Sequence, residues 1–316
     1  AAAAAADGRT LSSDELVWYT HPADKWENAL PLGNGRLGAM VFGRTDEEEI
    51  QLNEETLWSG GPYSTTVRGG SEALPEIRRL LFDGELIRAH RLFGRHLMGR
   101  PVEQQKYQSL GSLVLKLEGS GEASDYRHEL DLDTAVVTTR YTRGGVRFER
   151  EAFVSPVGQV LVVRLSAKAP GAISFVAQLR GARNQAHSNY ATDYFRMDGV
   201  GDDSLVVRGK SADYLGVAGK LRYESRLVAA RRGGELRRDD DRLVVRRADE
   251  VTLRLAAARV RPPLPSRCFC LRLAPARGST CWVFAGSADC LPKESGSCSR
   301  FTAAELVGWW KRSISK

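Results

Sequence analysis

The sequence predicts an all-β protein built around one large β-sandwich, with a single short helical insertion. Three observations lead to this fold class: many short segments alternate apolar and polar residues, turn signals such as Gly144-Gly145 and Gly233-Gly234 separate them, and before Arg259 helical spacing is confined to residues 71–98. After Arg259 only residues 303–311 look helical. Strands that follow one another without intervening helices favour two packed antiparallel sheets over an α/β sheet. We therefore expect a super-sandwich, in which each sheet has many strands.

The first third of the chain contains an arm, three strands and the insertion. Residues 1–14 are rich in alanine and polar residues, and we expect them to form a disordered arm. In the segments 71–82 and 85–98 apolar residues recur at spacings of three and four, which is typical of amphipathic helices. Gly84 separates the two segments, so we expect two short helices in a hairpin-like insertion. The strands expected before them are LVWYT, LGAMVFG and EEIQLN.

From Gln108 to Ala258 the strand pattern returns, so the sandwich domain is expected to span residues 15–258. At Arg259 the character of the chain changes, and Pro, Arg and Cys occur without periodicity. We expect residues 259–316 to be an irregular tail, and the abrupt change favours a foreign reading frame or an alternative exon over a genuine, poorly ordered extension.

The charge of the chain argues against nucleic acid as a partner. The net charge is +7, but the tail holds ten Lys plus Arg and three Asp plus Glu, which leaves 46 − 10 = 36 basic and 39 − 3 = 36 acidic residues in the body. A neutral body without a basic and aromatic stripe does not fit a nucleic-acid-binding domain, although the pI of 9.3 suggests one. The most apolar stretch, residues 159–179, contains Arg164, Lys168 and Pro170, so no membrane partner is expected either.

Metal and cofactor sites are not expected. All five cysteines lie in the tail, their spacing matches no paired zinc-ligand pattern, and the last histidine is His187. The segment GNGRLG lacks the spacing and the following helix of a dinucleotide-binding turn. Of the carboxylate pairs, Glu54 and Glu55 are adjacent on a strand and point to opposite faces. Asp131 and Asp133 would share a face, about 6.5–7 Å apart, but are explained more simply as solvent-facing charges.

Two segments carry a resemblance to a known family. They are LPLGNGRLGAMVF, residues 30–42, and IQLNEETLWSGGP, residues 50–62, and the blocks EALPEIRRLLFDGELIRA and YQSLGSLVLKL follow in order. The chain resembles the N-terminal β-sandwich of α-L-fucosidases of glycoside hydrolase family 95, from about Trp18 to Ala258. The resemblance implies a following (α/α)6 barrel that carries the catalytic residues, and inverting hydrolysis of terminal α-1,2-linked L-fucose from a fucosylated glycan.

The resemblance also sets what this chain is expected to lack. Its 316 residues end before such a barrel, so we expect a truncated fragment without catalytic residues, inactive by itself, whose packing partner is the missing barrel. The family resemblance slightly favours an extracellular or periplasmic location. The alternative function is a non-catalytic carbohydrate-binding sandwich module, which would bind a fucosylated glycan without turnover.

Polar and aromatic residues of these segments are candidates for contact with a sugar or with the barrel. Sugars need hydrogen-bonding side chains for their hydroxyls and rings for their apolar faces. The opposing interpretation is that Gly33, Gly35 and Gly38 serve tight turns and that Trp58 belongs to the core. We also expect an exposed apolar patch beside the two segments, with Trp58 or Trp26 at or near it. The candidates are Trp26, Asn34, Arg36, Asn53, Glu54 and Trp58.

Overall fold

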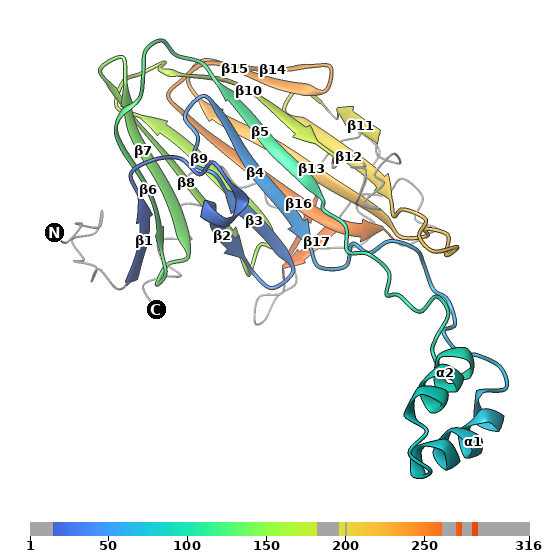
Figure 1. Ribbon diagram of the computed structural model, residues 1–316. Coiled ribbons are helices and arrows are strands. Elements are labelled where there is room, and N and C mark those ends of the chain that lie inside the picture. Colours follow the sequence, from blue (N-terminus) through green and yellow to red (C-terminus); the bar gives the residue numbers. More distant parts are fainter. Residues whose placement is uncertain (1–14, 182–195, 200, 261–269, 274–279, 284–316) are drawn as a thin grey trace.

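Two large antiparallel sheets pack face to face, and a pair of helices stands away from them (Figure 1). The computed structural model describes residues 15–181, 196–199, 201–260, 270–273 and 280–283. The all-β prediction is confirmed, and every pairing between described strands is antiparallel. This arrangement follows from a chain whose apolar residues alternate and whose strands are joined by short turns.

The larger sheet has nine strands, and the smaller one has seven. The order in the nine-stranded sheet is β1 (Leu16–Tyr19), β6 (Ser124–Asp131), β7 (Val136–Arg143), β8 (Val146–Ser155), β9 (Val160–Ala167), β16 (Glu250–Val260), β13 (Arg222–Arg232), β12 (Ser204–Lys210) and β11 (Arg196–Gly199). The order in the seven-stranded sheet is β14 (Glu235–Asp239), β15 (Arg242–Ala248), β10 (Ile173–Arg180), β5 (Gly111–Leu117), β4 (Glu47–Glu54), β3 (Leu37–Val41) and β2 (Leu30–Gly33).

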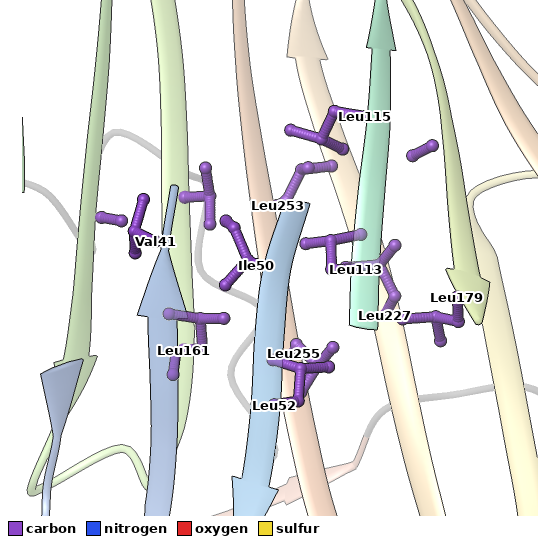
Figure 2. Close-up of a cluster of buried hydrophobic side chains, with 14 of the residues drawn as sticks. Val41, Ile50, Leu52, Leu113, Leu115, Leu161, Leu179, Leu227, Leu253 and Leu255 are labelled. Atoms are coloured by element: carbon purple, nitrogen blue, oxygen red, sulfur yellow. The ribbon is translucent and has the colours of Figure 1, made fainter. Parts of the chain in front are cut away.

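The core lies between the two sheets (Figure 2). In β10 the buried residues alternate with half-buried ones, so Phe175 and its neighbours two positions away face the core. Ile50 of one sheet and Leu161 and Leu227 of the other are completely buried. Full burial of such a side chain contributes about 1.5–3 kcal/mol, so these facing rows hold the sheets together.

Glycine pairs close two of the predicted hairpins. Gly144 and Gly145 join β7 to β8 with φ of 56° and 75°, and Gly233 and Gly234 join β13 to β14 with φ of 69° and 60°. Two successive positive φ angles are the requirement of the tight hairpin turn that matches strand twist. A Cβ at Gly234 would also lie 2.1 Å from the Arg246 carbonyl oxygen, so this turn accepts only glycine.

The helical insertion is confirmed between β4 and β5, as helices α1 (Gly70–Phe82) and α2 (Leu86–His96). Gly84, with φ of 76°, lies in the turn between them. The two helices bury Ile77, Leu80 and Ala89. Among the described helices none is long and apolar enough to cross a membrane.

A buried polar cluster lies where β3 turns into β4. Glu48, which is completely buried, accepts hydrogen bonds from the backbone N–H groups of Phe42 and Gly43, both at 3.1 Å, and pairs with the buried guanidinium of Arg150. The His128 ring lies beside it, with Nε2 3.2 Å from the Val41 carbonyl oxygen. Burial lowers the pKa of His128 to about 4, so this imidazole is neutral.

The two ends of the chain lie largely outside the described residues. The arm predicted at residues 1–14 is among them, as is most of the tail predicted at 259–316. Within that tail the structure has two short strands, β17 (Cys270–Leu273) and β18 (Thr280–Val283), which pair with each other. They differ from the expectation of a wholly irregular tail, and Leu, Thr, Trp and Val are residues that favour strands.

Candidate functional site

Strand register brings the two motif segments together at one end of the sandwich. The turn between β2 and β3 holds Asn34 and Arg36, and β4 ends with Asn53 and Glu54. Because β3 and β4 are antiparallel, with Leu37 opposite Glu54, the start of β3 lies beside the end of β4. Asn34, Arg36, Asn53 and Glu54 therefore share this end, while the buried polar cluster lies at the other.

Arg36 connects four parts of the fold. Its Nε donates to Gln159 Oε1 at 2.8 Å, and its Nη1 donates to the Ala257 carbonyl oxygen at 2.6 Å, at the end of β16. The same Nη1 is 3.4 Å from Glu54 Oε1. The β2–β3 turn, β4, the β8–β9 turn and β16 are thus joined by one guanidinium, and we call Arg36 and Glu54 the Arg36 brace.

Glu54 is 3% exposed, and both of its carboxylate oxygens are engaged. Its Oε2 accepts hydrogen bonds from the backbone N–H and the hydroxyl of Thr56, at 2.9 and 2.7 Å. A carboxylate held in this way fixes the chain where it leaves β4. The contacts that the structure shows for Glu54 are therefore positional.

Asn34 organises its own turn. Its Oδ1 accepts hydrogen bonds from the backbone N–H groups of Arg36 and Leu37, at 3.1 and 2.8 Å, and its Nδ2 donates to the Ser155 carbonyl oxygen at 3.1 Å. Gly35, at φ of 88°, supplies the left-handed step that the turn needs. Asn34 therefore connects the turn to β8 of the opposite sheet.

The exposed part of this end is a set of side chains that we call the Trp58 platform: Asn53, Trp58 and Tyr107. Trp58 is 38% exposed, and its ring meets the Tyr107 ring edge to face, with centroids 5.2 Å apart. The Tyr107 hydroxyl lies 2.5 Å from Asn53 Oδ1 and 2.8 Å from the Glu54 carbonyl oxygen. The partial exposure of Trp58 does not fit its interpretation as a core residue. The exposed apolar patch expected beside the two segments stays a prediction.

Electrostatics keep the tyrosine of the platform protonated. Burial raises the pKa of Tyr107, the Asn53 hydrogen bond opposes that rise, and the carboxylates of Glu54 and Glu55 add to it. The phenol therefore remains a neutral donor at physiological pH. An amide, a phenol and two ring faces together can bind hydroxyls and apolar ring faces, or a complementary protein surface.

Tyr107 was missed by reasoning on the sequence. It stands at the start of the block YQSLGSLVLKL, 49 positions after Trp58, on the far side of the helical insertion. An isolated bridge between the backbones of Trp58 and Tyr107 joins the two sides of the insertion. The only sequence signal was that both aromatic residues flank the inserted helices.

Trp26 lies apart from the other candidates. It is 56% exposed, in the short 3₁₀ helix η2 (Trp26–Asn28) that precedes β2. The adjacent Ala29 packs with Ala23 and Phe42, at the end of β3 that is far from Asn34. The structure therefore does not bring Trp26 to the Trp58 platform.

The expected geometry of Asp131 and Asp133 is wrong. β6 ends at Asp131, and Asp133 lies in the following turn, where Asp131 Oδ1 accepts hydrogen bonds from the backbone N–H groups of Asp133 and Thr134 at 2.9 and 3.2 Å. Asp131 is thus a turn residue. Over the part of the chain that the structure describes, no group of three or more His, Cys, Asp or Glu side chains could hold a metal ion.

Comparison with known proteins gives one family match. The model of the family described as "Glycosyl hydrolase family 65, N-terminal domain" matches residues 17–259. Alpha-L-fucosidase 2 from Arabidopsis thaliana is 38% identical over 172 residues, which cover 54% of this chain and 20% of that protein. Probable alpha-fucosidase A from Aspergillus niger is 39% identical over 145 residues, 44% of this chain and 18% of the relative. The chain thus spans about a fifth of the length of these relatives.

Among solved structures, a putative kojibiose phosphorylase from human microbiome is similar with a TM-score of 0.45 and 9% sequence identity, over 78% of this chain and 32% of that one.

Proposed function

Since the chain belongs to the family of glycosyl hydrolase family 65 N-terminal domains, we propose that it acts as the N-terminal sandwich of a longer hydrolase that removes α-L-fucose. The names of the curated relatives support this activity. The motifs of residues 30–62 support the finer assignment, which is inverting hydrolysis of terminal α-1,2-linked L-fucose as in glycoside hydrolase family 95. The proposed partners are a fucosylated glycan and a catalytic barrel.

The observation that carries the proposal is the Trp58 platform standing on the Arg36 brace. Trp58 and Tyr107 are exposed or half-buried aromatic residues, and the brace beneath them is tied to both sheets. Functional surfaces need such rigid support from the layer below. β16 ends near the brace, since the Ala257 carbonyl oxygen accepts a hydrogen bond from Arg36.

The sandwich is proposed to support catalysis rather than to perform it. An inverting glycosidase needs an acid and a base about 6.5–9.5 Å apart across the sugar. The buried carboxylate beneath the platform is Glu54, and both of its oxygens are occupied within the fold. We therefore propose that the 316-residue polypeptide has no fucosidase activity by itself.

A carbohydrate-binding module is the second candidate, and the exposure of Trp58 favours it. The test is to mix the purified 316-residue chain with a fucosyl-α-1,2-galactoside, and to measure both released fucose and binding by calorimetry. Neither release nor binding is the expected result. Binding without release, lost in Trp58→Ala but retained in Trp26→Ala, would favour the module, and fucose release well above buffer would overturn the proposal.

A further inference from the structure

The tip of the helical hairpin carries apolar side chains that nothing in the described structure covers. Phe82 is 90% exposed, Ile87 70%, Leu86 63% and Leu81 49%. These four residues end α1 and begin α2, so they are neighbours on either side of the Gly84 turn, and we call them the hairpin tip. Single exposed apolar residues are ordinary, but a contiguous group on a monomer marks an interaction surface.

The hairpin does not need these residues for its own packing. Besides Gly70, the buried residues of the two helices are Ile77 and Leu80 of α1 and Ala89 of α2, each at most 4% exposed. Helices α1 and α2 stand away from the sheets (Figure 1). The exposed apolar surface is therefore additional to what stabilises the hairpin.

The charges beside the tip are paired with one another. Arg79 bridges Glu76 at 2.8 Å and Asp83 at 2.7 Å, and Arg88 pairs with Glu85 at 2.7 Å. The carboxylates nearest the turn are thus neutralised within the hairpin. A partner can cover the tip without meeting an unpaired acidic group, which lowers the desolvation cost of docking.

We propose that the hairpin tip docks onto the domain that follows the sandwich in the longer hydrolase, as a second contact beside the Trp58 platform. This inference rests on the proposed function. The insertion leaves the sandwich between the end of β4 and the start of β5, at the end of the molecule that carries the Arg36 brace and the end of β16 (Figure 1). A domain continuing from β16 therefore starts on the side toward which the hairpin extends.

The size of the tip favours a tethered domain over a second copy of the chain. Stable association of separate proteins takes about 20–30 residues a side, whereas the tip offers four large apolar side chains. A covalently linked domain is present at a millimolar effective concentration, so a small patch is enough. Residues 68–100 hold seven Arg and four Asp plus Glu, so the matching surface should be apolar with carboxylates around it.

The test compares the 316-residue chain with a graft in which residues 15–260 replace the matched domain of Arabidopsis Alpha-L-fucosidase 2. Hydroxyl-radical oxidation reports the exposure of individual side chains. We expect Phe82 to be oxidised at least fivefold more slowly in the graft, while Leu132, 55% exposed in the β6–β7 turn, keeps its rate. Equal oxidation of Phe82 in both proteins would overturn the inference.

Substitution of the tip provides an independent measurement. Phe82→Ser with Ile87→Ser should leave the melting temperature of the 316-residue chain within about 1 °C, and lower that of the graft by about 3 °C or more. Leu132→Ser is the matched control and should change neither. The same pair of substitutions at the aligned positions of the intact Arabidopsis enzyme repeats the test in a natural chain, and no shift there would also overturn the inference.

Three further outcomes bear on this inference and on the proposed function. Protection of Trp58 and Tyr107 in the graft without protection of Phe82 would reject the hairpin contact and retain the platform as the interface. Protection of neither would reject both. Concentration-dependent dimers of the 316-residue chain that Phe82→Ser abolishes would assign the tip to a second copy, and so would also overturn the inference.

Discussion

At the scale of single residues, hydrogen bonding determines which ring nitrogen of the neutral His128 carries the proton. The Val41 carbonyl oxygen can only accept, so Nε2, 3.2 Å away, carries the proton, and Nδ1 accepts from the Thr139 hydroxyl at 3.0 Å. Both ring nitrogens are satisfied in the neutral state. Protonation would place a charge beside Arg150 in a buried site, which is why burial lowers the pKa of His128 to about 4.

We expect His128 to make the sandwich less stable in mild acid. An unfolded histidine binds a proton near pH 6.5 and the folded one only near pH 4, so between these values the unfolded state holds more protons and stability falls with falling pH, by up to about 1.4 kcal/mol per pH unit. Urea unfolding of the wild type and of His128→Gln from pH 7 to pH 4 measures this difference. Burial also raises the pKa of Glu48. That shift has the opposite effect on stability, but it is present in both proteins and cancels in the difference between their free energies of unfolding. If this difference did not change with pH, the lowered pKa of His128 would be contradicted.

A second prediction at this scale concerns the Arg36 brace. Arg36→Met leaves the buried carboxylate of Glu54 without its cation and the Ala257 carbonyl without its donor, so we expect a loss of about 2–3 kcal/mol. The control is Arg180→Met, which removes a pair with Glu47 in which both side chains are almost half exposed, and should cost at most about 1 kcal/mol. Urea unfolding gives both values. Equal costs would mean that the brace adds no more than a surface pair.

The residues of the site could be predicted only in part. Asn34, Arg36, Asn53, Glu54 and Trp58 were recognised because the two motifs are local and unusual in composition. The functions of Asn34 and Arg36 as internal ties depend on Ser155, Gln159 and Ala257, all more than 100 positions away. Trp26 was grouped with the others because it is near them in sequence, yet it precedes β2, whereas Asn34 and Arg36 follow the opposite end of that strand.

At the scale of elements, alternation predicts the strands and spacing predicts the helices. The insertion expected at residues 71–82 and 85–98 forms α1 and α2 almost within those bounds. The end of β6 was misjudged because LDLDTAVV continues the alternation past Asp131, whereas the Asp131 side chain closes a turn there. The Asp131 carboxylate accepts from the backbone N–H groups two and three positions ahead, which favours a turn over a continued strand. Such side-chain hydrogen bonds are not visible in the alternation of apolar and polar residues.

The insertion should be separable from the sandwich. Its two ends are adjacent, because a Cβ on Gly99 would lie 3.0 Å from the Cβ of Thr65. We expect replacement of residues 66–98 by a short Gly-Ser turn to leave the strands folded, to remove the helical signal from the far-ultraviolet spectrum, and to change the melting temperature by only a few degrees. Aggregation or loss of the cooperative transition would show that the helices are part of the core.

At the scale of the whole molecule, the β-sandwich carries the Trp58 platform at the end where β16, its last long strand, ends. The fold class was predictable because nearly every strand has one buried face. The position of the platform was not, since it requires Trp58 and Tyr107 to meet across the insertion. We propose that this end of the sandwich contacts the rest of a fucosidase or its sugar.

The graft of residues 15–260 into Arabidopsis Alpha-L-fucosidase 2 tests that claim most directly, through kcat/KM for a fucosyl-α-1,2-galactoside. We predict that the graft is active, that Trp58→Ala lowers kcat/KM at least tenfold, and that Trp26→Ala, which removes a more exposed tryptophan at the other end of β2, changes it less than twofold. A folded graft without activity, or equal effects of the two substitutions, would contradict the account.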